Sequence, residues 1–310
     1  MSTVQKIDRS HYIRGFQDFL ILEKGMSAHS ISAYTHDVEY FFEYIDLHAD
    51  QIDIRSIDTD HLRGYLEYLA KLGLHPTTQS RMLSGIRAFY KYLQIEDIIE
   101  KDPTQLIENP KLSRKIPEVL TFEEVQAVLN AVDLSHPQGT RNRAILETLY
   151  ACGLRVSELT DLKITNLFTE IGVVKVIGKN DKERLVPIGA SAIKHINYWL
   201  NHDRKQINPI QKGNENYVFL NRRGSRLSRV MIFNIVKEHV RKAGIEKSVS
   251  PHTFRHSFAT HLVEGGADLR AVQDMLGHES ILTTEIYTHI DTAYLRDTVM
   301  AYHPLYRKES

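Results

Sequence analysis

The sequence has one cysteine, one tryptophan and no long apolar segment. Cys152 is the only thiol among 310 residues, so no disulfide can form within the chain, which suits a reducing cytoplasm. The first ten residues, MSTVQKIDRS, are polar and contain no secretory signal. No uncharged apolar run approaches the roughly 18–20 residues that a membrane span needs. The sequence therefore predicts a cytoplasmic protein without a membrane partner.

The chain also lacks an excess of either charge, with 39 Lys and Arg against 39 Asp and Glu. The two signs are unevenly distributed, however. Residues 1–110 carry 11 basic and 17 acidic groups, which leaves 28 basic and 22 acidic groups of the two totals of 39 for the rest. The net charge thus changes from −6 to +6, so a zero total does not exclude a nucleic-acid partner for the second part.

The sign of the charge changes at residues 108–120, ENPKLSRKIPEVL, where Pro110 and Pro117 bracket a basic stretch. Prolines on both sides of a polar segment are typical of an interdomain linker, although a surface loop within one domain has the same composition. We expect a helical N-terminal domain over residues 1–107, a linker over 108–120 and a C-terminal domain over 121–310.

The N-terminal domain has the periodicity of a four-helix bundle. Apolar residues recur at helical spacing from Ser27 onward, again over residues 58–72 with Asp58 or Asp60 as cap, and again from Pro76. The last of these helices carries basic residues on its polar side. They are Arg81, Arg87 and Lys91. They could face a DNA backbone or form a solvated surface.

The C-terminal domain has a mixed pattern. Helices are predicted over 121–132 and 139–153, and the spacing of Thr121 and Glu124 is that of a capping box. Two β-branched runs over 171–189 flank a turn at 178–181, which predicts a β-hairpin, and a second short hairpin is predicted over 216–228. Helices resume at Ser228. The predicted fold class is mainly α with a small antiparallel β-sheet.

Reactive side chains occur in four stretches of the C-terminal domain. His252 and Arg255 are three residues apart and share a helix face, and the same holds for Arg155 and Glu158. The other candidates are Lys179 in the hairpin turn, His278 and Tyr287. Cationic donors, proton-transfer groups and an oxygen nucleophile together suit phosphoryl transfer. Spacing alone does not show that these side chains converge.

Four motifs, CGLRVSEL, VIGKNDKERLVPI, HTFRHSFATHL and LGHESILTTEIYTH, occur in the order found in the tyrosine recombinases. The chain resembles that family, also called the phage integrase family, and within it the Xer-type site-specific recombinases. SAYTHDVEYF and LSGIRAFYKYL are similar to the family's N-terminal DNA-clamping domain, and AYHPLY is similar to the Xer tail. The resemblance therefore covers both domains. It implies a four-helix clamping domain followed by a mixed α/β catalytic domain.

The resemblance also implies a role for each candidate. Tyr287 is expected to attack a DNA phosphodiester, giving a 3′-phosphotyrosyl link and a free 5′-hydroxyl. Arg155 and Arg255 are expected to hold the two non-bridging oxygens, and Lys179 to protonate the leaving 5′-oxygen. His252 is expected to take or share the tyrosine proton. The expected roles of the last two residues are a hydrogen bond from His278 to the phosphate and an orienting contact from Glu158.

The residue types account for this chemistry without a cofactor. A tyrosine with a pKa near 10 needs cations and a base to attack at neutral pH, and fixed guanidiniums can take the place of metal ions. His252 and His256 are spaced like a metal pair, but the glutamate of HExxH is missing, so no metal is predicted and His256 and His261 are expected to be structural. No phosphate-binding Walker A sequence is present either.

A basic turn lies upstream of the C-terminal helices. Its arginines are Arg222, Arg223, Arg226 and Arg229. Contact with a phosphate backbone is the favoured interpretation, and a solvated loop is the alternative.

These features predict a site-specific DNA recombinase acting through a Holliday junction, with a role in chromosome dimer resolution at cell division. The expected partners are a duplex recombination site, three further protomers in a homo- or hetero-tetramer with a sister recombinase, and a DNA translocase as activator. The segment 291–306 is expected to dock on a neighbouring protomer. The alternatives are a mobile-element recombinase or integrase, a type IB topoisomerase-like enzyme, and a catalytically silent DNA-binding protein.

Overall fold

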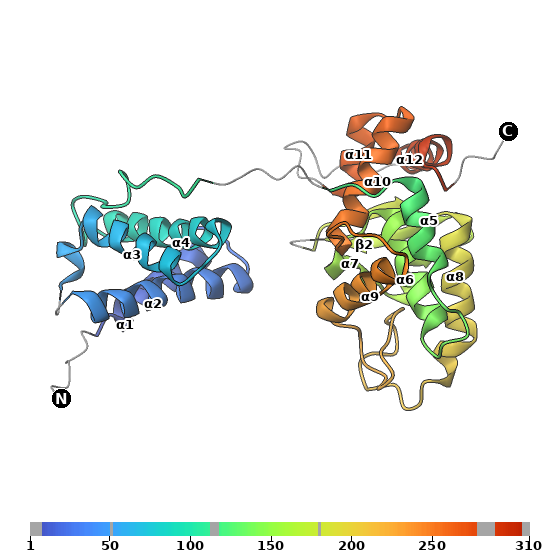
Figure 1. Cartoon of the computed structure of the whole chain (residues 1–310), viewed down its shortest axis with the longest axis horizontal. Coiled ribbons are helices and arrows are strands. Elements are labelled where there is room, and N and C mark those ends of the chain that lie inside the picture. The colour runs from blue at the N-terminus through green and yellow to red at the C-terminus, as the bar shows by residue number, and fades with distance from the viewer. Residues whose placement is uncertain (1–7, 50–51, 112–117, 179–180, 278–288, 306–310) are drawn as a thin grey trace. The chain divides into compact units, whose positions relative to one another are not determined.

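The computed structural model describes residues 8–49, 52–111, 118–178, 181–277 and 289–305. Compact units form over Met1–Lys115 and Ile116–Ser310, and each has its own hydrophobic core. Figure 1 shows the helices of the first unit in blue to teal and those of the second in green to red. Among the described residues, no helix is long and apolar enough to cross a membrane. The predicted boundaries at 107 and 121 stay a prediction.

The first unit is a helix bundle, as predicted, and side chains cap several of its helices. Its helices are α1 (Ser10–Leu22), α2 (Ala28–His48), α3 (Thr59–Lys71) and α4 (Pro76–Ile95), with a short 3-10 turn at Ile54–Ser56. Ser27 accepts a hydrogen bond from the backbone of Ser30, and Asp58 caps α3. Helix α2 packs against α1 and α4. Aromatic rings such as Phe41, Phe89 and Tyr65 fill the core between them.

The second unit surrounds a central helix with a sheet and further helices. The helices are α5 (Phe122–Asn130), α6 (Gly139–Cys152), α7 (Val156–Thr160), α8 (Ala190–Asn201), α9 (Arg229–Lys242), α10 (Pro251–Gly265), α11 (Leu269–Leu276) and α12 (His289–Tyr302). Short 3-10 turns lie at Ile164–Asn166 and Asp203–Gln206. The predicted capping box of Thr121 and Glu124 is present at α5. Nearly every residue of α6 is buried, and it packs against α8 and α10.

The sheet is antiparallel, in the order β1 (Leu167–Phe168), β2 (Val173–Ile177) and β3 (Glu183–Pro187). The predicted hairpin is formed by β2 and β3, whose register pairs Val174 with Val186 and Val176 with Arg184. Strand β1 was not predicted. The fold is mainly α with a small antiparallel sheet, as predicted.

The second predicted hairpin, over 216–228, is only partly present. A single bridge joins Leu220 to Arg226, and no regular strand forms there. Residues 216–218 pair with 162–164 instead: Ile164 donates to the carbonyl of Asn216, and Val218 donates to the carbonyl of Leu162. The start of the first predicted arm is thus paired with residues 162–164, and the two arms contact each other only near the turn, where Asn221 donates to the carbonyl of Ser225 and Leu227 to that of Phe219.

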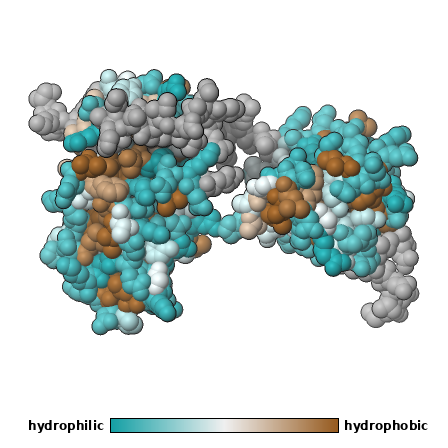
Figure 2. Space-filling view, turned by 180° about the vertical axis from the view of Figure 1, so that it is seen from behind, coloured by the Kyte–Doolittle hydropathy of each residue, from teal (hydrophilic) through white to brown (hydrophobic). Residues whose placement is uncertain are grey.

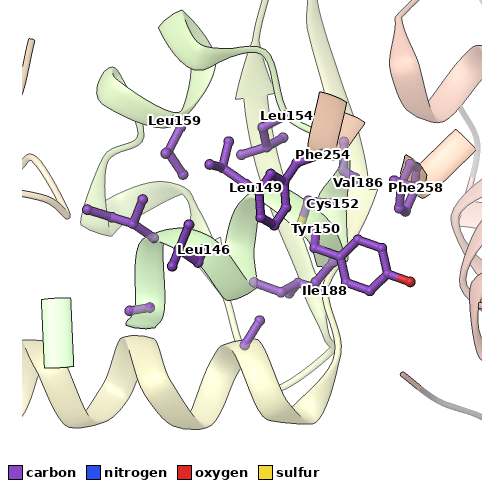
Figure 3. Packing of buried hydrophobic residues seen from close by; sticks show 14 of the residues in the cluster. Leu146, Leu149, Tyr150, Cys152, Leu154, Leu159, Val186, Ile188, Phe254 and Phe258 are labelled. Carbon is purple, nitrogen blue, oxygen red and sulfur yellow. The ribbon is translucent and has the colours of Figure 1, made fainter. Parts of the chain in front are cut away.

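The core of the second unit brings α6 together with β3 and α10. In Figure 3, Leu146, Leu149 and Leu154 lie close to Phe254, and the hydroxyl oxygen of Tyr150 points away from the other labelled side chains. That hydroxyl forms a 2.7 Å hydrogen bond with Nδ1 of His261, in agreement with the structural role predicted for this histidine. On the outside, Figure 2 shows a largely hydrophilic face with separate hydrophobic patches.

The described part of the C-terminal segment packs on its own chain. Leu295 and Val299 are buried in the core of the second unit, Arg296 donates to the carbonyl of Ile171 at 3.4 Å, and His303 is fully buried. Gly265 provides space for this contact, because a Cβ there would lie 2.5 Å from the carbonyl oxygen of Tyr302. The sequence predicted docking of this segment on a neighbouring protomer, and that expectation stays a prediction.

Candidate functional site

Arg155 and Glu158 are positioned by a sharp turn between α6 and α7. Gly153 ends α6 in the left-handed conformation (φ +56°), and a Cβ at this position would lie 2.4 Å from the ring of Phe258. The turn makes Arg155 the N-terminal cap of α7. Its backbone N–H and its Nη1 each donate to Glu158, at 2.8 Å. The predicted proximity of these two side chains is therefore found.

Arg255 reaches the same place from α10, 100 positions further along the chain. Its Nη1 donates to the carbonyl of Gly153 at 2.7 Å and lies 3.9 Å from Oε2 of Glu158. Burial, and next the charge of Arg155, lower the pKa of Arg255 to about 10, so it stays protonated at neutral pH. The side chain of Arg255 is 6% exposed and that of Arg155 is 40% exposed. The two arginines thus lie near the same carboxylate, with Arg255 buried and Arg155 partly exposed to solvent.

Arg184 is a third arginine at this carboxylate, and sequence reasoning missed it. Its Nη1 and Nη2 donate to Oε1 and Oε2 of Glu158, both at 2.8 Å, and the pair is almost fully buried. A signal was available, because side chains alternate along a strand and Arg184 shares the inward face of β3 with Val186. A buried arginine requires a carboxylate partner, and Glu158 was the acidic residue already among the candidates.

The three arginines also hold the end of α11. Three consecutive carbonyls there each accept a hydrogen bond from a different guanidinium. Met275 accepts from Nε of Arg184 at 2.8 Å, Leu276 from Nη2 of Arg255 at 2.6 Å, and Gly277 from Nη2 of Arg155 at 3.0 Å. The last carbonyls of a helix lack partners within it and carry its negative dipole end, which favours cations.

The cluster has one negative and three positive side chains, which gives a formal net charge of +2. Burial opposes the ionisation of Glu158, but the hydrogen bonds and charge of Arg184, followed by those of Arg155, hold its pKa below the usual range. Glu158 is therefore ionised at neutral pH. The remaining excess of positive charge suits an anion such as a phosphodiester.

Four further candidate residues remain, namely His252, Lys179, His278 and Tyr287. His252 is exposed in the first turn of α10, one turn before the buried Arg255. His278 follows Gly277, whose carbonyl is held by Arg155. Lys179, His278 and Tyr287 lie outside the described residues.

The basic residues predicted on α4 have different surroundings. Arg81 forms a 2.5 Å ion pair with the fully buried Asp37, while its own side chain is about half exposed. Arg87 donates to the side chain of Asn109 and to the carbonyl of Ile107, which holds the end of the first unit. Lys91 is exposed. Arg81 therefore stays partly accessible to DNA despite its ion pair with Asp37. Arg87 instead uses its guanidinium to bind residues of its own domain.

The arginines of the basic turn are all exposed, but they are not equivalent. Arg226 forms an ion pair with Asp161, and its guanidinium lies 5.4 Å from the ring centroid of Tyr217. Arg222 and Arg223 lie in the turn stabilised by Asn221, whose side chain accepts from the backbone of Arg223. Arg226 therefore has a compensating carboxylate beside it.

Comparison with known proteins identifies both units. A family model described as "Phage integrase family" matches residues 118–293, and one described as "Phage integrase, N-terminal SAM-like domain" matches residues 13–97. Tyrosine recombinase XerD of Listeria innocua is 41% identical over 292 residues, which are 94% of this chain and 98% of that protein. Tyrosine recombinase XerD of Chlorobaculum tepidum is 43% identical over 292 residues, covering 93% and 95%.

Solved structures agree with this assignment. XerH site-specific recombinase in a post-cleavage complex with a palindromic difH substrate is 25% identical, with a TM-score of 0.70, covering 96% of this chain and 90% of that one. A lambda integrase dimer bound to a COC′ core site, 16% identical with a TM-score of 0.66 over 90% and 99% of the two chains, shares the fold. The chain belongs to the phage integrase family and is a site-specific tyrosine recombinase similar to the Xer type.

Proposed function

We propose that this recombinase cuts and rejoins duplex DNA at a specific site through a 3′-phosphotyrosyl intermediate on Tyr287. The observation that carries the proposal is the meeting of Arg155 and Arg255 at one carboxylate, against the helix end that precedes His278. Residues from three distant parts of the chain are thereby fixed around an excess of positive charge. A scissile phosphate is the anion that this reaction requires at such a place.

The two arginines supply transition-state stabilisation. A guanidinium has five N–H donors, and two of the nitrogens of each arginine are engaged with the protein. The remaining donors can bind the two non-bridging oxygens, on which charge builds as phosphorus becomes pentavalent. Because the guanidiniums are already fixed, little reorganisation is needed when the phosphate arrives.

Each remaining candidate residue has a role in the bonds that form and break. The Oη of Tyr287 forms a bond to phosphorus while the bond to the 5′-oxygen breaks. His252 takes the tyrosine proton, Lys179 delivers a proton to the leaving 5′-oxygen, and His278 donates to the phosphate. In the second step a 5′-hydroxyl attacks the phosphotyrosine and releases Tyr287. One ester replaces another in each step, so the exchange needs no ATP.

The proposed DNA partner and assembly are supported by analogy with solved relatives. XerH was solved with a difH substrate, and a lambda integrase dimer with a core site. By analogy we propose that four protomers, of this chain alone or with a sister recombinase, join two DNA sites and resolve them through a Holliday junction. We further propose that the reaction resolves chromosome dimers at cell division under the control of a DNA translocase. In this role Arg81, Lys91, Arg222 and Arg223 contact the DNA backbone.

Trapping the covalent complex tests the proposal and identifies the site. The protein is incubated with fragmented genomic DNA of its host that carries random nicks, because a nick beside the cleavage position releases a short fragment and prevents rejoining. Adducts that survive denaturation are isolated and their DNA is sequenced. We expect adducts at one chromosomal sequence for the wild-type protein and none for Tyr287→Phe, which should retain DNA binding.

Each other outcome contradicts a part of the proposal. Adducts at the ends of a mobile element would assign the chain to that element and not to the chromosome. Adducts at random positions, with relaxation of supercoiled DNA, would indicate a topoisomerase. DNA binding without any adduct would indicate a silent DNA-binding protein, and an adduct with Tyr287→Phe would refute the nucleophile.

A further inference from the structure

Arg184 links three segments that carry the candidate site. It projects from β3, binds Glu158 of α7 through both Nη atoms and binds the carbonyl of Met275 in α11 through Nε. The side chain is 8% exposed, so it is fixed by packing as well as by hydrogen bonds. A bidentate contact to a carboxylate fixes both distance and plane, which a lysine ammonium cannot do.

The neighbouring backbone is shaped to accommodate this guanidinium. Gly277 ends α11 with φ +64°, and a Cβ there would lie 3.1–3.2 Å from Arg184. On the other side, a Cβ on Gly178 would lie 3.6 Å from Nη1 of Arg184 and 3.7 Å from Oε1 of Glu158. Glycines therefore border the buried ion pair at the end of β2 and at the end of α11.

Arg184 differs from Arg155 in its access to a ligand. Both guanidiniums bind Oε1 of Glu158 at 2.8 Å, but the side chain of Arg155 is 40% exposed and that of Arg184 is not. Three bonds of Arg184 go to protein atoms. Arg184 therefore holds Glu158 in place, and Glu158 in turn holds Nη1 and the backbone N–H of Arg155.

We propose that Arg184 is a positioning residue, which orients Arg155 through Glu158 toward one non-bridging oxygen of the scissile phosphate. The inference rests on the proposed function. Its consequence is that loss of the fork at position 184 impairs the contact of Arg155 with that oxygen while DNA binding is kept. Misplacement of a guanidinium by about 1 Å is enough to lower a rate about 100-fold.

The test measures covalent adduct formation on the DNA site identified by trapping. Three substrates are compared: the ordinary phosphodiester and the two methylphosphonate diastereomers, in each of which a methyl group replaces one non-bridging oxygen. Arg184→Lys keeps the charge and removes the fork. The matched control is Glu183→Gln, its exposed neighbour on β3, which pairs with Lys175.

On the phosphodiester, we expect Arg184→Lys to bind DNA normally and to form adduct 10- to 100-fold more slowly, at roughly the size of effect seen for orienting residues. On the diastereomer that lacks the oxygen held by Arg155, the defect should shrink to a few-fold. The defect of Arg155→Ala in adduct formation should shrink on the same diastereomer, and the defect of Arg255→Ala should shrink on the other one. Glu183→Gln should resemble the wild-type protein throughout.

The comparison between substrates is made on one preparation, so a fraction of unfolded Arg184→Lys cancels from the ratio. If that variant yields no active protein, Glu158→Asp provides the second test, because a shorter carboxylate should displace Arg155 and give the same diastereomer dependence. Equal defects on all three substrates, or no defect on the phosphodiester, would overturn the inference alone. A wild-type protein that forms no adduct would overturn the proposed function and this inference together.

Discussion

Glu158 and Arg184 form a bidentate ion pair inside the second unit, with both Nη to Oε distances at 2.8 Å. The same carboxylate binds Arg155 and lies 3.9 Å from Arg255. One acid thus compensates part of the charge of three arginines, whose other partners are the last carbonyls of α11 and, for Arg255, also the carbonyl of Gly153. Removal of one member of such a buried set leaves charges that have lost their partner.

Glu158→Gln should therefore destabilise the protein. The amide keeps the shape of the carboxylate but loses its charge and one acceptor, so the free energy of unfolding should fall by about 3 kcal/mol. Urea denaturation of the two proteins measures this difference. Glu183→Gln is the control, with an expected loss below about 0.5 kcal/mol because its ion pair is exposed. Equal stability of Glu158→Gln and the wild-type protein would contradict the ion-pair account.

The stability of the α12 contact should depend on His303. Burial, and next the charge of His261, lower the pKa of His303 to about 3, against 6.5 for a free histidine. The unfolded chain therefore takes up a proton at this residue below pH 6.5 that the folded chain does not. The stability contributed by neutral His303 is complete above pH 6.5 and is lost progressively as the pH falls toward 3.

The measurement compares how steeply the free energy of unfolding changes with pH in the wild-type protein and in His303→Gln. Absolute stabilities are not compared, because the variant also loses packing against Tyr150 and Phe258. Between pH 6 and pH 4, the free energy of unfolding of the wild-type protein should fall more steeply than that of the variant, by about 1 kcal/mol per pH unit. His261, whose pKa is also lowered by burial, remains in both proteins and cancels. Parallel slopes would exclude this role for His303.

Gly277→Ala should impair the site as well as the fold. Gly277 and Gly244 both follow a helix and both have positive φ, +64° and +70°. A Cβ at Gly244 meets nothing within 4 Å, so Gly244→Ala should cost only the backbone strain of about 1 kcal/mol. A Cβ at Gly277 presses on Arg184, so this variant should lose more stability and also form adduct more slowly. Equal effects of the two substitutions would show that Arg184 tolerates the displacement.

The basic turn should contribute unequally to DNA affinity. The logarithm of DNA affinity falls as the logarithm of salt concentration rises, and Arg223→Ala should make this negative slope shallower by about 1, as expected for the loss of one phosphate contact. Arg226→Ala should change the slope less, because Asp161 already compensates that charge. Binding of the identified DNA site is measured from about 50 to 200 mM salt. A larger change for Arg226→Ala than for Arg223→Ala would contradict this assignment.

Local signals predicted most of the fold. The start of the apolar period at Ser27, the cap at Asp58 and the capping box at Thr121 each depend on residues a few positions apart, so the sequence alone identifies where those helices begin. The β2–β3 hairpin was predictable for the same reason. A short hairpin was predicted over 216–228, but Asn216 and Val218 pair with residues more than 50 positions away. Local turn chemistry contains no information about that competing partner.

The site was predictable only in part. Arg155, Glu158 and Arg255 were identified through motif resemblance, and their convergence depends on the turn at Gly153 and on the packing of α10 against α6. Arg184 was missed because the hairpin was interpreted through the lysines of its turn and not through the inward face of β3. The contact of α12 with its own domain was missed because burial of Leu295 and Val299 depends on surfaces far away in the sequence.

Identification of the linked residue and of the DNA end tests the account most directly. Protein trapped on DNA is digested with protease and nuclease, and the peptide that carries a nucleotide is sequenced by mass spectrometry. The account predicts one modified residue, Tyr287, joined to a 3′-phosphate, with a free 5′-hydroxyl on the other DNA end. A link to any other side chain, or a 5′-phosphate joined to the protein, would contradict it.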